Sequence, residues 1–280
     1  MFKPKMPGIW LTVVSVCFLA TRADARDLSV RVNRWLEFRT LTGNVQYTSS
    51  GRTQTARVGA RLNAVGDGVR TGRRSSARLA VDTNVGFVTV SENSDVRITQ
   101  LRANRSGGRV TDLTVLRGQA RLQVRPFTHR DSELNIRTPA GVSGVRGTEF
   151  GVAVKPDGIT GVATLEGRVV SSAQGVSVDV PEGFQTLIEP GEPPQPPEPL
   201  RDDPTLIVNV LQTATVDGNR VVEIVGSTDK VNLLVINDEV QSTDEAGGFD
   251  VQVPLSDDRR VQAAVITPLG TEQVYELVVP

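Results

Sequence analysis

The apolar residues of this chain fall into short runs, and no run keeps the period of an amphipathic helix. From residue 35 onward, runs such as residues 85–90, 113–116 and 120–124 either alternate apolar with polar residues or are rich in β-branched residues. Turn-forming Gly, Asn and Asp residues separate the runs. Because a strand points alternate side chains to opposite faces, this pattern predicts strands throughout. We therefore predict an all-β protein.

The last 75 residues or so repeat the pattern on a smaller scale. Six apolar runs occupy residues 206–211, 221–225, 231–236, 249–253, 261–266 and 274–279. Polar turns separate them, among them Asp217-Gly218 and Leu269-Gly270. Short strands at even spacing with polar turns are typical of a small β-sandwich, so we predict one here.

A proline-rich stretch divides the two strand-rich regions. Residues 189–204 contain seven prolines and five acidic residues. Such a composition favours extended polyproline conformation and a semi-rigid spacer. The alternative is a proline-rich surface loop within a single domain. We favour the spacer, which predicts a β-domain over residues 26–190, a linker over residues 191–204 and a second β-domain over residues 205–280.

The first 25 residues have the composition of a secretory signal peptide. Lys3 and Lys5 precede an apolar stretch of 12 residues, 9–20, and residues 23–25 form a small-x-small cleavage pattern, which predicts cleavage between Ala25 and Arg26. The alternative, a membrane anchor, needs about 20 apolar residues. The only cysteine, Cys17, lies inside the run. We expect a periplasmic or secreted protein with no transmembrane span in the mature chain.

The two predicted domains differ in charge. Residues 26–200 carry 23 basic and 17 acidic residues, and 22 of the basic ones are arginine; residues 201–280 carry 5 basic and 14 acidic residues. Arginine pairs with carboxylates and phosphates, so the expected partner is an envelope protein or an anionic polymer. Two alternatives remain open: a solvated face of arginines, and docking of the basic domain onto the acidic one. Aromatic residues make up only 4% of the chain, which argues against nucleic-acid binding.

No catalytic, metal or cofactor set emerges from the sequence. The single histidine, His129, lies in a polar turn, and no Gly-x-Ser-x-Gly motif is present. Because the mature chain would have one His and no Cys, we do not expect a zinc site. Glu149 and Glu166 are the acids that a two-carboxylate glycosidase would need, although both look like exposed strand positions. We predict no enzyme activity, no metal and no cofactor.

Three segments share the form Leu-x-Gly-x-(Val/Ala), at residues 41–45, 116–120 and 165–169. Glycine adopts positive φ without steric cost, as tight hairpins require. We therefore predict three hairpins at these positions.

Residues 138–150, TPAGVSGVRGTEF, form the most distinctive motif. A phosphate-binding loop would need a lysine and a following helix, whereas an alternating strand follows here. The segment resembles the signature of the FecR family, with a T-P-x-(G/A) entry and an R-G-T-x-F core, and residues 65–72 resemble its G-D-x-I-x-T-G segment. Residues 165–169 and 181–183 resemble its later turns, so the resemblance spans about residues 35–190. The signature residues are Gly66, Asp67, Thr71, Gly72, Thr138, Pro139, Gly141, Gly144, Arg146, Gly147, Thr148 and Phe150.

The resemblance implies a jelly-roll-like β-sandwich and, for residues 205–280, similarity to bacterial Ig-like modules. The founding type of the family carries a cytoplasmic sigma-factor-binding segment and a membrane span, which we do not find before this domain. The architecture is therefore similar to secreted FecR proteins, and we expect a non-catalytic envelope binding or scaffolding protein. The alternative is an extracytoplasmic sensor module for a separately encoded trans-envelope signalling system. We expect the signature to be structural, with Arg146 bonded to backbone carbonyls of its corner.

Overall fold

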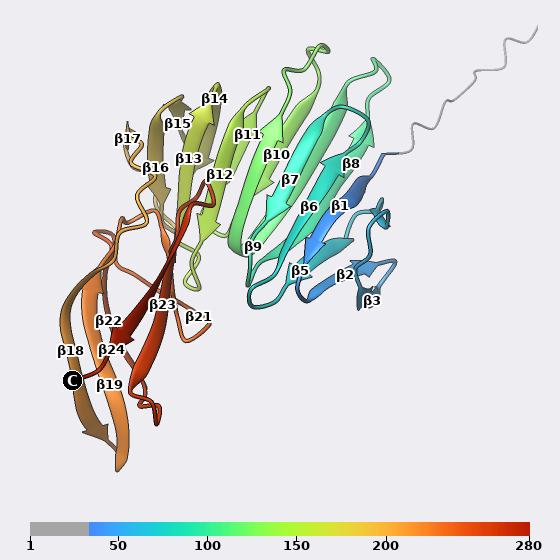
Figure 1. Ribbon diagram of the computed structural model, residues 1–280. Coiled ribbons are helices and arrows are strands. Elements are labelled where there is room, and N and C mark those ends of the chain that lie inside the picture. Colours follow the sequence, from blue (N-terminus) through green and yellow to red (C-terminus); the bar gives the residue numbers. More distant parts are fainter. Residues whose placement is uncertain (1–33) are drawn as a thin grey trace, which may run out of the picture. The chain divides into compact units, whose positions relative to one another are not determined.

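Two long β-sheets face each other in the first part of the fold, and one bent strand belongs to both (Figure 1). The computed structural model describes residues 34–280, and these contain strands, turns and no helix. The predicted all-β class is therefore confirmed. The predicted signal peptide, with its cleavage site at Ala25 and Arg26, lies outside the described residues.

Sheet A and sheet B, as we call them, together hold 17 strands, and all neighbouring strands are antiparallel except β9 and β10. In order across sheet A the strands are β4 (Arg61–Leu62), β1 (Leu36–Thr42), β6 (Ser76–Val81), β7 (Gly86–Val90), β9 (Arg109–Val124), β12 (Glu149–Val154), β13 (Thr160–Glu166), β16 (Phe184–Ile188) and β17 (Glu198–Pro199). In order across sheet B they are β3 (Arg52–Thr55), β2 (Val45–Ser49), β5 (Gly68–Thr71), β8 (Asp95–Ala103), the first half of β9, β10 (Glu133–Arg137), β11 (Val142–Val145), β14 (Arg168–Ala173) and β15 (Val176–Pro181).

The three predicted hairpins are instead corners between the sheets. Strand β1 lies in sheet A and β2 in sheet B, β9 changes sheet within its own length, and β13 and β14 lie in different sheets. The glycines of these corners, Gly43, Gly118 and Gly167, have φ of 69°, 83° and 82°. The sequence pattern correctly indicated tight turns. It could not distinguish a hairpin from a corner, because both need a glycine with positive φ at the same place. They differ only in which strands pair, and the residues of the turn do not encode that.

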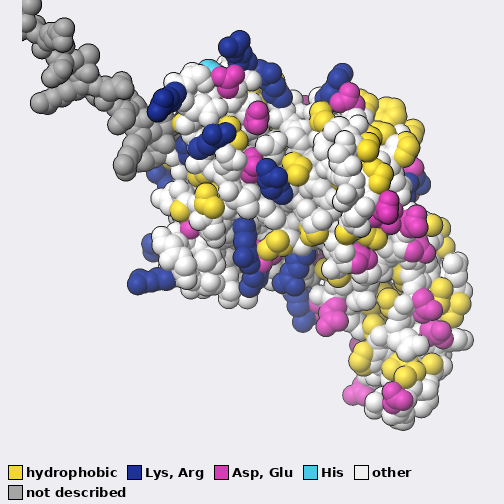
Figure 2. Space-filling view, turned by 180° about the vertical axis from the view of Figure 1, so that it is seen from behind, with side chains coloured by type: hydrophobic (Ala, Val, Ile, Leu, Met, Phe, Trp, Pro, Cys, Tyr) yellow, Lys and Arg dark blue, Asp and Glu magenta, His cyan; other side chains and the backbone are white. Residues whose placement is uncertain are grey.

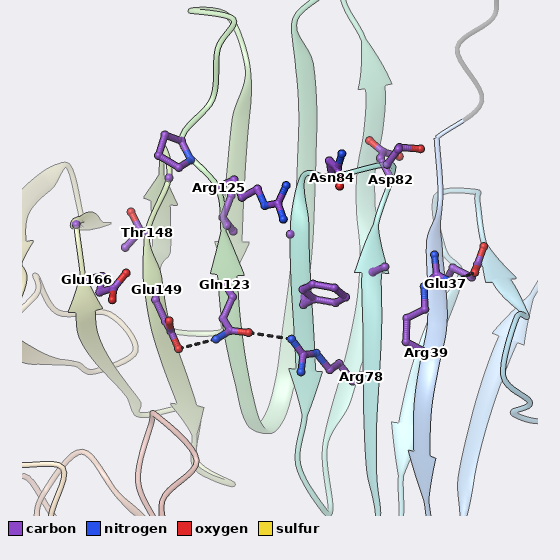
Figure 3. Close-up of a pocket in the computed structure, with 18 of the residues that line it drawn as sticks. Glu37, Arg39, Arg78, Asp82, Asn84, Gln123, Arg125, Thr148, Glu149 and Glu166 are labelled. Carbon is purple, nitrogen blue, oxygen red and sulfur yellow. Dashed lines mark hydrogen bonds and ion pairs between the residues drawn. The ribbon is translucent and has the colours of Figure 1, made fainter.

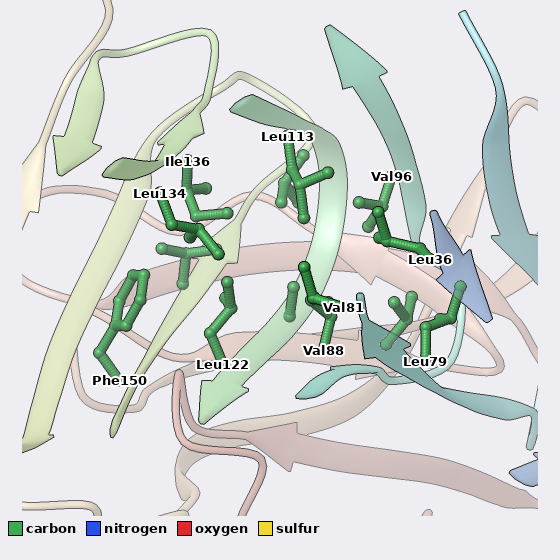
Figure 4. Close-up of a cluster of buried hydrophobic side chains, with 14 of the residues drawn as sticks. Leu36, Leu79, Val81, Val88, Val96, Leu113, Leu122, Leu134, Ile136 and Phe150 are labelled. Carbon is green, nitrogen blue, oxygen red and sulfur yellow. The ribbon is translucent and has the colours of Figure 1, made fainter. Parts of the chain in front are cut away.

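A single apolar core lies between sheets A and B (Figure 4). Sheet A contributes Leu79, Leu122 and Phe150, and sheet B contributes Leu113 and Ile136. All five are at most 1% exposed. The two inward faces therefore form a sandwich of the expected kind.

The C-terminal strands form two smaller sheets with a core of their own. Ile224, Phe249 and Val265 belong to this second core. One sheet has the order β18 (Ile207–Val216), β19 (Asn219–Ser227) and β22 (Gly248–Pro254); the other has the order β21 (Glu239–Gln241), β20 (Leu233–Ile236), β23 (Arg260–Ile266) and β24 (Glu272–Val278). We call this part the C-terminal sandwich. Its similarity to Ig-like modules stays a prediction.

The proline-rich segment is not a free spacer. Its Gln195 donates from the backbone nitrogen to the Leu187 carbonyl at 2.9 Å and accepts a 2.6 Å hydrogen bond from Thr186 Oγ1. Strand β17 then pairs with β16 at the edge of sheet A. Prolines lack an N–H group, so a proline-rich strand closes a sheet edge without offering donors to a further strand.

The C-terminal sandwich contacts the outer face of sheet A within the compact unit Asn33–Pro280. A Cβ atom added at Gly151 would lie 1.8 Å from the Pro268 carbonyl oxygen, and one at Gly161 would lie 2.3 Å from that of Val231. Ala153 joins an apolar cluster with residues of β20 and β23. The absence of side chains at the two glycines lets backbone approach backbone, and the contact is tight because of it.

Candidate functional site: a groove on the outer face of sheet A

The part of sheet A that the C-terminal sandwich leaves free is hollowed into a groove of about 1270 Å³ (Figure 3). Its floor is made by outward-facing side chains of β1, β6, β7, β9 and β12. Side chains two residues apart on a strand share a face, so strands paired in register bring their outward residues into rows. Phe87, for example, is the register partner of Gln123, which in turn is the partner of Glu149.

Two aromatic rings in the groove are each covered by an arginine. The guanidinium carbon of Arg61 lies 4.4 Å from the ring centre of Trp35, and that of Arg78 lies 4.2 Å from the ring centre of Phe87. These are cation–π distances, and such pairs stabilise by about 0.5–1 kcal/mol at exposed sites. Each pair forms a flat, amphipathic surface on the groove wall.

A polar row crosses the groove floor from β6 to β12 (Figure 3). Arg78 donates to Gln123 Oε1 at 3.1 Å, and Gln123 Nε2 donates to Glu149 Oε1 at 2.9 Å. Arg121 Nε donates to the same carboxylate oxygen at 2.9 Å. The row fixes the orientation of the Gln123 amide and the Glu149 carboxylate, so the groove offers polar groups in set positions.

Other charged groups of the groove divide into paired and free ones. Arg39 and Arg61 both pair with Glu37, at 2.9 and 2.7 Å. Arg125 and Glu166 are exposed, and neither side chain has a hydrogen-bond or ion-pair partner among residues 34–280. The groove therefore presents one cation and one carboxylate that a ligand can take up.

Glu149 and Glu166, the two acids singled out from the sequence, do lie side by side. They are register partners on β12 and β13, and both line the groove. Glu149 accepts hydrogen bonds from Arg121 and Gln123, which hold its carboxylate in one orientation. No group of three or more metal-ligating side chains occurs in the described part of the chain.

The signature acid Asp67 lies away from the groove and holds a turn. It is 2% exposed, and its carboxylate accepts hydrogen bonds from the backbone nitrogens of Ser50 and Asn63 at 3.0 and 2.9 Å. Gly66, just before it, has φ of 92°. Asp67 therefore ties the turn after β2 to the turn before β5.

Thr71 and Gly72 join the end of β5 to two neighbouring turns. Thr71 Oγ1 donates to the Ser91 carbonyl at 2.5 Å and accepts from the Ser94 backbone nitrogen at 3.0 Å. The Gly72 nitrogen donates to the Asn44 carbonyl at 2.9 Å. These bonds hold the chain where it changes between the sheets.

Thr138 closes the turn between β10 and β11. Its Oγ1 accepts a 3.2 Å hydrogen bond from the Gly141 nitrogen, and its own nitrogen donates to the Gly141 carbonyl at 2.8 Å. A Cβ at Gly141 would lie 2.7 Å from the Ser172 carbonyl oxygen, so the turn abuts β14. Pro139 lies in this turn beside Gly158. Gly144 lies in β11 beside Asn135.

The R-G-T-x-F core forms another corner between the sheets, after β11. Gly147 has φ of 100°, and a Cβ there would lie 2.4 Å from Pro126 Cα. Thr148 Oγ1 donates to the Arg168 carbonyl at 3.0 Å, and Phe150 is fully buried in the core. The predicted bonds from Arg146 to backbone carbonyls are not found: its side chain is exposed and bonds none of residues 34–280. Thr148 holds the corner instead, through its hydroxyl.

Many arginines that the charge count brought to attention are bound to carboxylates on the outer face of sheet B. Asp95 accepts from Arg70 at 2.7 Å and from Arg97 at 3.2 Å, and Asp112 accepts from Arg137 at 2.8 Å. Burial acts to raise the pKa of Asp95, but the hydrogen bonds and charges of Arg97 and Arg70 outweigh it and lower that pKa. On the face in Figure 2, Lys and Arg gather over the first part of the chain. Ion pairs with buried acids account for part of this arginine content.

Sequence reasoning missed the groove. Its residues Trp35, Arg78, Phe87 and Gln123 come from separate segments of the chain and match no motif. The available signal was the alternation of each strand, which marks outward positions without saying which strands become neighbours. His129, by contrast, lies in a loop as expected, with Nε2 2.7 Å from the Ser106 carbonyl.

Comparison with known proteins identifies the first part of the chain. Residues 67–170 match the family model of the FecR protein. Two solved structures of a candidate anti-sigma factor from Parabacteroides distasonis ATCC 8503 share 13% and 14% identity, with TM-scores of 0.38 and 0.37; each match covers 46% of this chain and 58% of the other. A polysaccharide lyase structure has 10% identity and a TM-score of 0.21, over 88% of this chain and 40% of that one. No curated protein matches the chain.

The chain thus spans less than two thirds of the length of the anti-sigma structures that it matches. Within residues 34–280, no helix is long and apolar enough to cross a membrane. The matched segment runs from Asp67 to β14 and contains the corners at Gly118, Gly147 and Gly167. This protein carries a FecR domain.

Proposed function

We propose that this is a non-catalytic binding protein of the cell envelope, which recognises its partner through the groove on sheet A. The observation that carries the proposal is the groove itself. It combines two arginine-covered rings, a fixed polar row and two free charges on one face of sheet A. Recognition sites of this kind need apolar surface and a few oriented polar groups.

The groove favours binding over catalysis. No histidine among residues 34–280 lines it, and of its two neighbouring carboxylates Glu149 is held by Arg121 and Gln123. Two arginines of the groove, Arg39 and Arg61, are already paired with Glu37, which favours a partner with mixed polar and apolar groups over a purely anionic polymer. An envelope protein fits the groove better than a polyanion does.

A second candidate function is an extracytoplasmic sensor or regulatory module. The FecR match over residues 67–170 supports it. In this version the groove partner is a component of a separately encoded trans-envelope signalling system. The predicted signal peptide supports a periplasmic or secreted location for either function.

Site-specific photocrosslinking tests the proposal. Arg125, the free cation of the groove, is replaced by p-benzoyl-phenylalanine in the full chain, and the envelope fraction is irradiated. Arg52 on β3 is the matched control, because it is an exposed arginine outside the groove. We expect one discrete crosslinked product from position 125 and none from position 52. Equal products from both positions, or none from position 125, would contradict the proposal.

The identity of the product separates the two candidate functions. A crosslinked receptor or transmembrane regulator supports the sensor function, and a structural envelope protein supports scaffolding. Phe87→Ala in the position-125 background should remove the product, because it takes away one of the two rings that face the ligand.

A further inference from the structure

Strand β18 differs from every other sheet edge in the described part of the chain. It pairs with β19 on one side and with no strand on the other. It is ten residues long, with the sequence IVNVLQTATV, and contains no charged residue, proline or glycine. Long uncharged edges are rare in monomeric proteins, because they offer a template for another strand.

The other edges are protected. Strands β4 and β17 are two residues long, and β21 has three. The remaining edges carry charges or proline, which are Arg52 in β3, Asp179 and Pro181 in β15, Asp250 and Pro254 in β22, and Glu272 and Glu276 in β24. The contrast indicates that β18 is left open for pairing.

The geometry of β18 defines which backbone groups are free. The turn at Asp217 and Gly218 has φ of 49° and 80°, which is a two-residue hairpin with Val216 and Asn219 as its closing pair. The closing pair of such a hairpin is hydrogen-bonded, so the backbone groups of Val216 point toward β19. The backbone N–H and C=O groups of every second residue before it, starting at Thr215, therefore point to the open side. These residues include Thr213 and Thr215, whose side chains are both exposed.

Apolar side chains border the same edge. Ile207 in β18 is 54% exposed, and Val278 in β24 is 63% exposed. The start of β18 lies beside β24, since Tyr275 Oη accepts from the Leu206 nitrogen at 3.2 Å. The open edge therefore begins with an exposed apolar residue, Ile207, next to a contact with β24.

We propose that β18 pairs antiparallel with β18 of a second copy of this chain, about a two-fold axis near Thr213. In a strand that pairs with itself about a two-fold axis, the residue on the axis faces its own copy, and charges of one sign elsewhere on the strand would gather along the shared edge. The absence of charge in β18 removes that repulsion. The rest of the C-terminal sandwich is acidic, so the dimer gains stability as salt screens the repulsion between copies.

Sedimentation velocity on the full chain tests the proposal. We expect a concentration-dependent monomer–dimer equilibrium, with a larger dimer fraction at high salt. Thr213→Lys should give monomer throughout, because two lysines then face each other across the axis. Gln252→Lys, on the opposite edge β22, adds the same charge and should behave as the wild type. A wild type that is monomeric at every concentration overturns the proposal. The same holds if β18 pairs only with a strand of a different protein.

A position-specific readout guards against a variant that fails to fold. In a Cys17→Ser background, which has no other cysteine, Thr213→Cys should crosslink to its copy with a short bismaleimide, and Gln252→Cys should not. Thermal unfolding of each variant should match the wild type. Equal crosslinking from both positions, or none from position 213, contradicts pairing through β18.

Discussion

The outer face of sheet A has two ends that share strands but serve different purposes. On β12, the outward residue Glu149 lies in the open groove, whereas Gly151 and Ala153 lie under the C-terminal sandwich. On β13, Glu166 faces the groove and Gly161 faces Val231. Large polar residues at one end and glycine or alanine at the other show that outward position alone does not make a residue exposed. The covered end has small outward side chains, and the open end has large polar ones.

The largest expected effect is at the covered end. Gly151→Ala places a Cβ 1.8 Å from the Pro268 carbonyl oxygen, so the C-terminal sandwich has to move away. We expect a loss of about 3 kcal/mol in the free energy of unfolding, the upper range for overpacking. Urea unfolding measures the loss, and limited proteolysis of residues 191–204 should become faster.

Gly144→Ala is the matched control for Gly151→Ala, because Gly144 is also a strand glycine. Its added Cβ would meet only the end of the Asn135 side chain, at 3.0 Å, which can turn aside. We expect stability within about 0.5 kcal/mol of the wild type. Similar losses in both variants would show that the covered end is not specially tight.

The next effect concerns Lys155, which is 1% exposed at the covered end and donates to Thr243 Oγ1 at 2.5 Å. Burial lowers the pKa of Lys155 to about 8, against the smaller opposing effect of nearby acids such as Asp157. Between pH 8 and its ordinary value of 10.5 the unfolded chain binds more protons at this site than the folded chain does. The stability of the wild type therefore rises with pH in that window.

Lys155→Met removes this dependence. The stability of the variant relative to the wild type should be greatest below pH 8, and should fall by about 3 kcal/mol as the pH reaches 10.5. Urea unfolding of both proteins across this range gives the difference directly. A difference that does not vary with pH would contradict the burial of a titrating amine at this contact.

At the open end, Phe87→Ala should affect stability less and binding more. Phe87 is partly exposed, so we expect a loss of about 1 kcal/mol from its truncation. Capture of the envelope partner should be lost, because the ring and the Arg78 that covers it form part of the groove. Pull-down from the envelope fraction measures capture, and unchanged capture would place recognition elsewhere.

The smallest effects separate two residues of the signature corner. Thr148→Val keeps the shape of the side chain but removes the hydrogen bond to the Arg168 carbonyl, which should cost about 1–2 kcal/mol. Arg146→Ala should leave stability within about 0.5 kcal/mol, since its side chain is exposed. Thermal unfolding of the two variants would contradict this assignment if Arg146→Ala were the more harmful.

The sequence allowed prediction of the features that depend on local pattern. Alternation of apolar residues predicted the strands, and the residues around Asp67 and Thr148 were sufficient to indicate the FecR family. The glycine corners were predicted as turns but assigned to hairpins, because pairing between distant strands decides the difference.

Features that arise only between distant residues could not be predicted. The row from Arg78 to Gln123 to Glu149 spans 72 positions of sequence and exists only through strand pairing. Gly151 and Gly161 lie inside strands, and the neighbouring sequence gives no reason for a glycine there. The reason is the close approach of the Pro268 and Val231 backbone, which the sequence does not reveal. Arg70 and Arg97 were counted as free charges, whereas the buried acid that binds both, Asp95, becomes their neighbour only through the folding of the sheet.

Cysteine accessibility tests most directly the claim that one face of sheet A has a covered and an open end. In the Cys17→Ser background, Ala163→Cys introduces a thiol beside Gly151, at a position that is 0% exposed, and Glu166→Cys introduces one in the groove. We predict that a maleimide reacts quickly at position 166 and at position 163 only after unfolding. Rapid reaction at both positions in the folded protein would contradict the account.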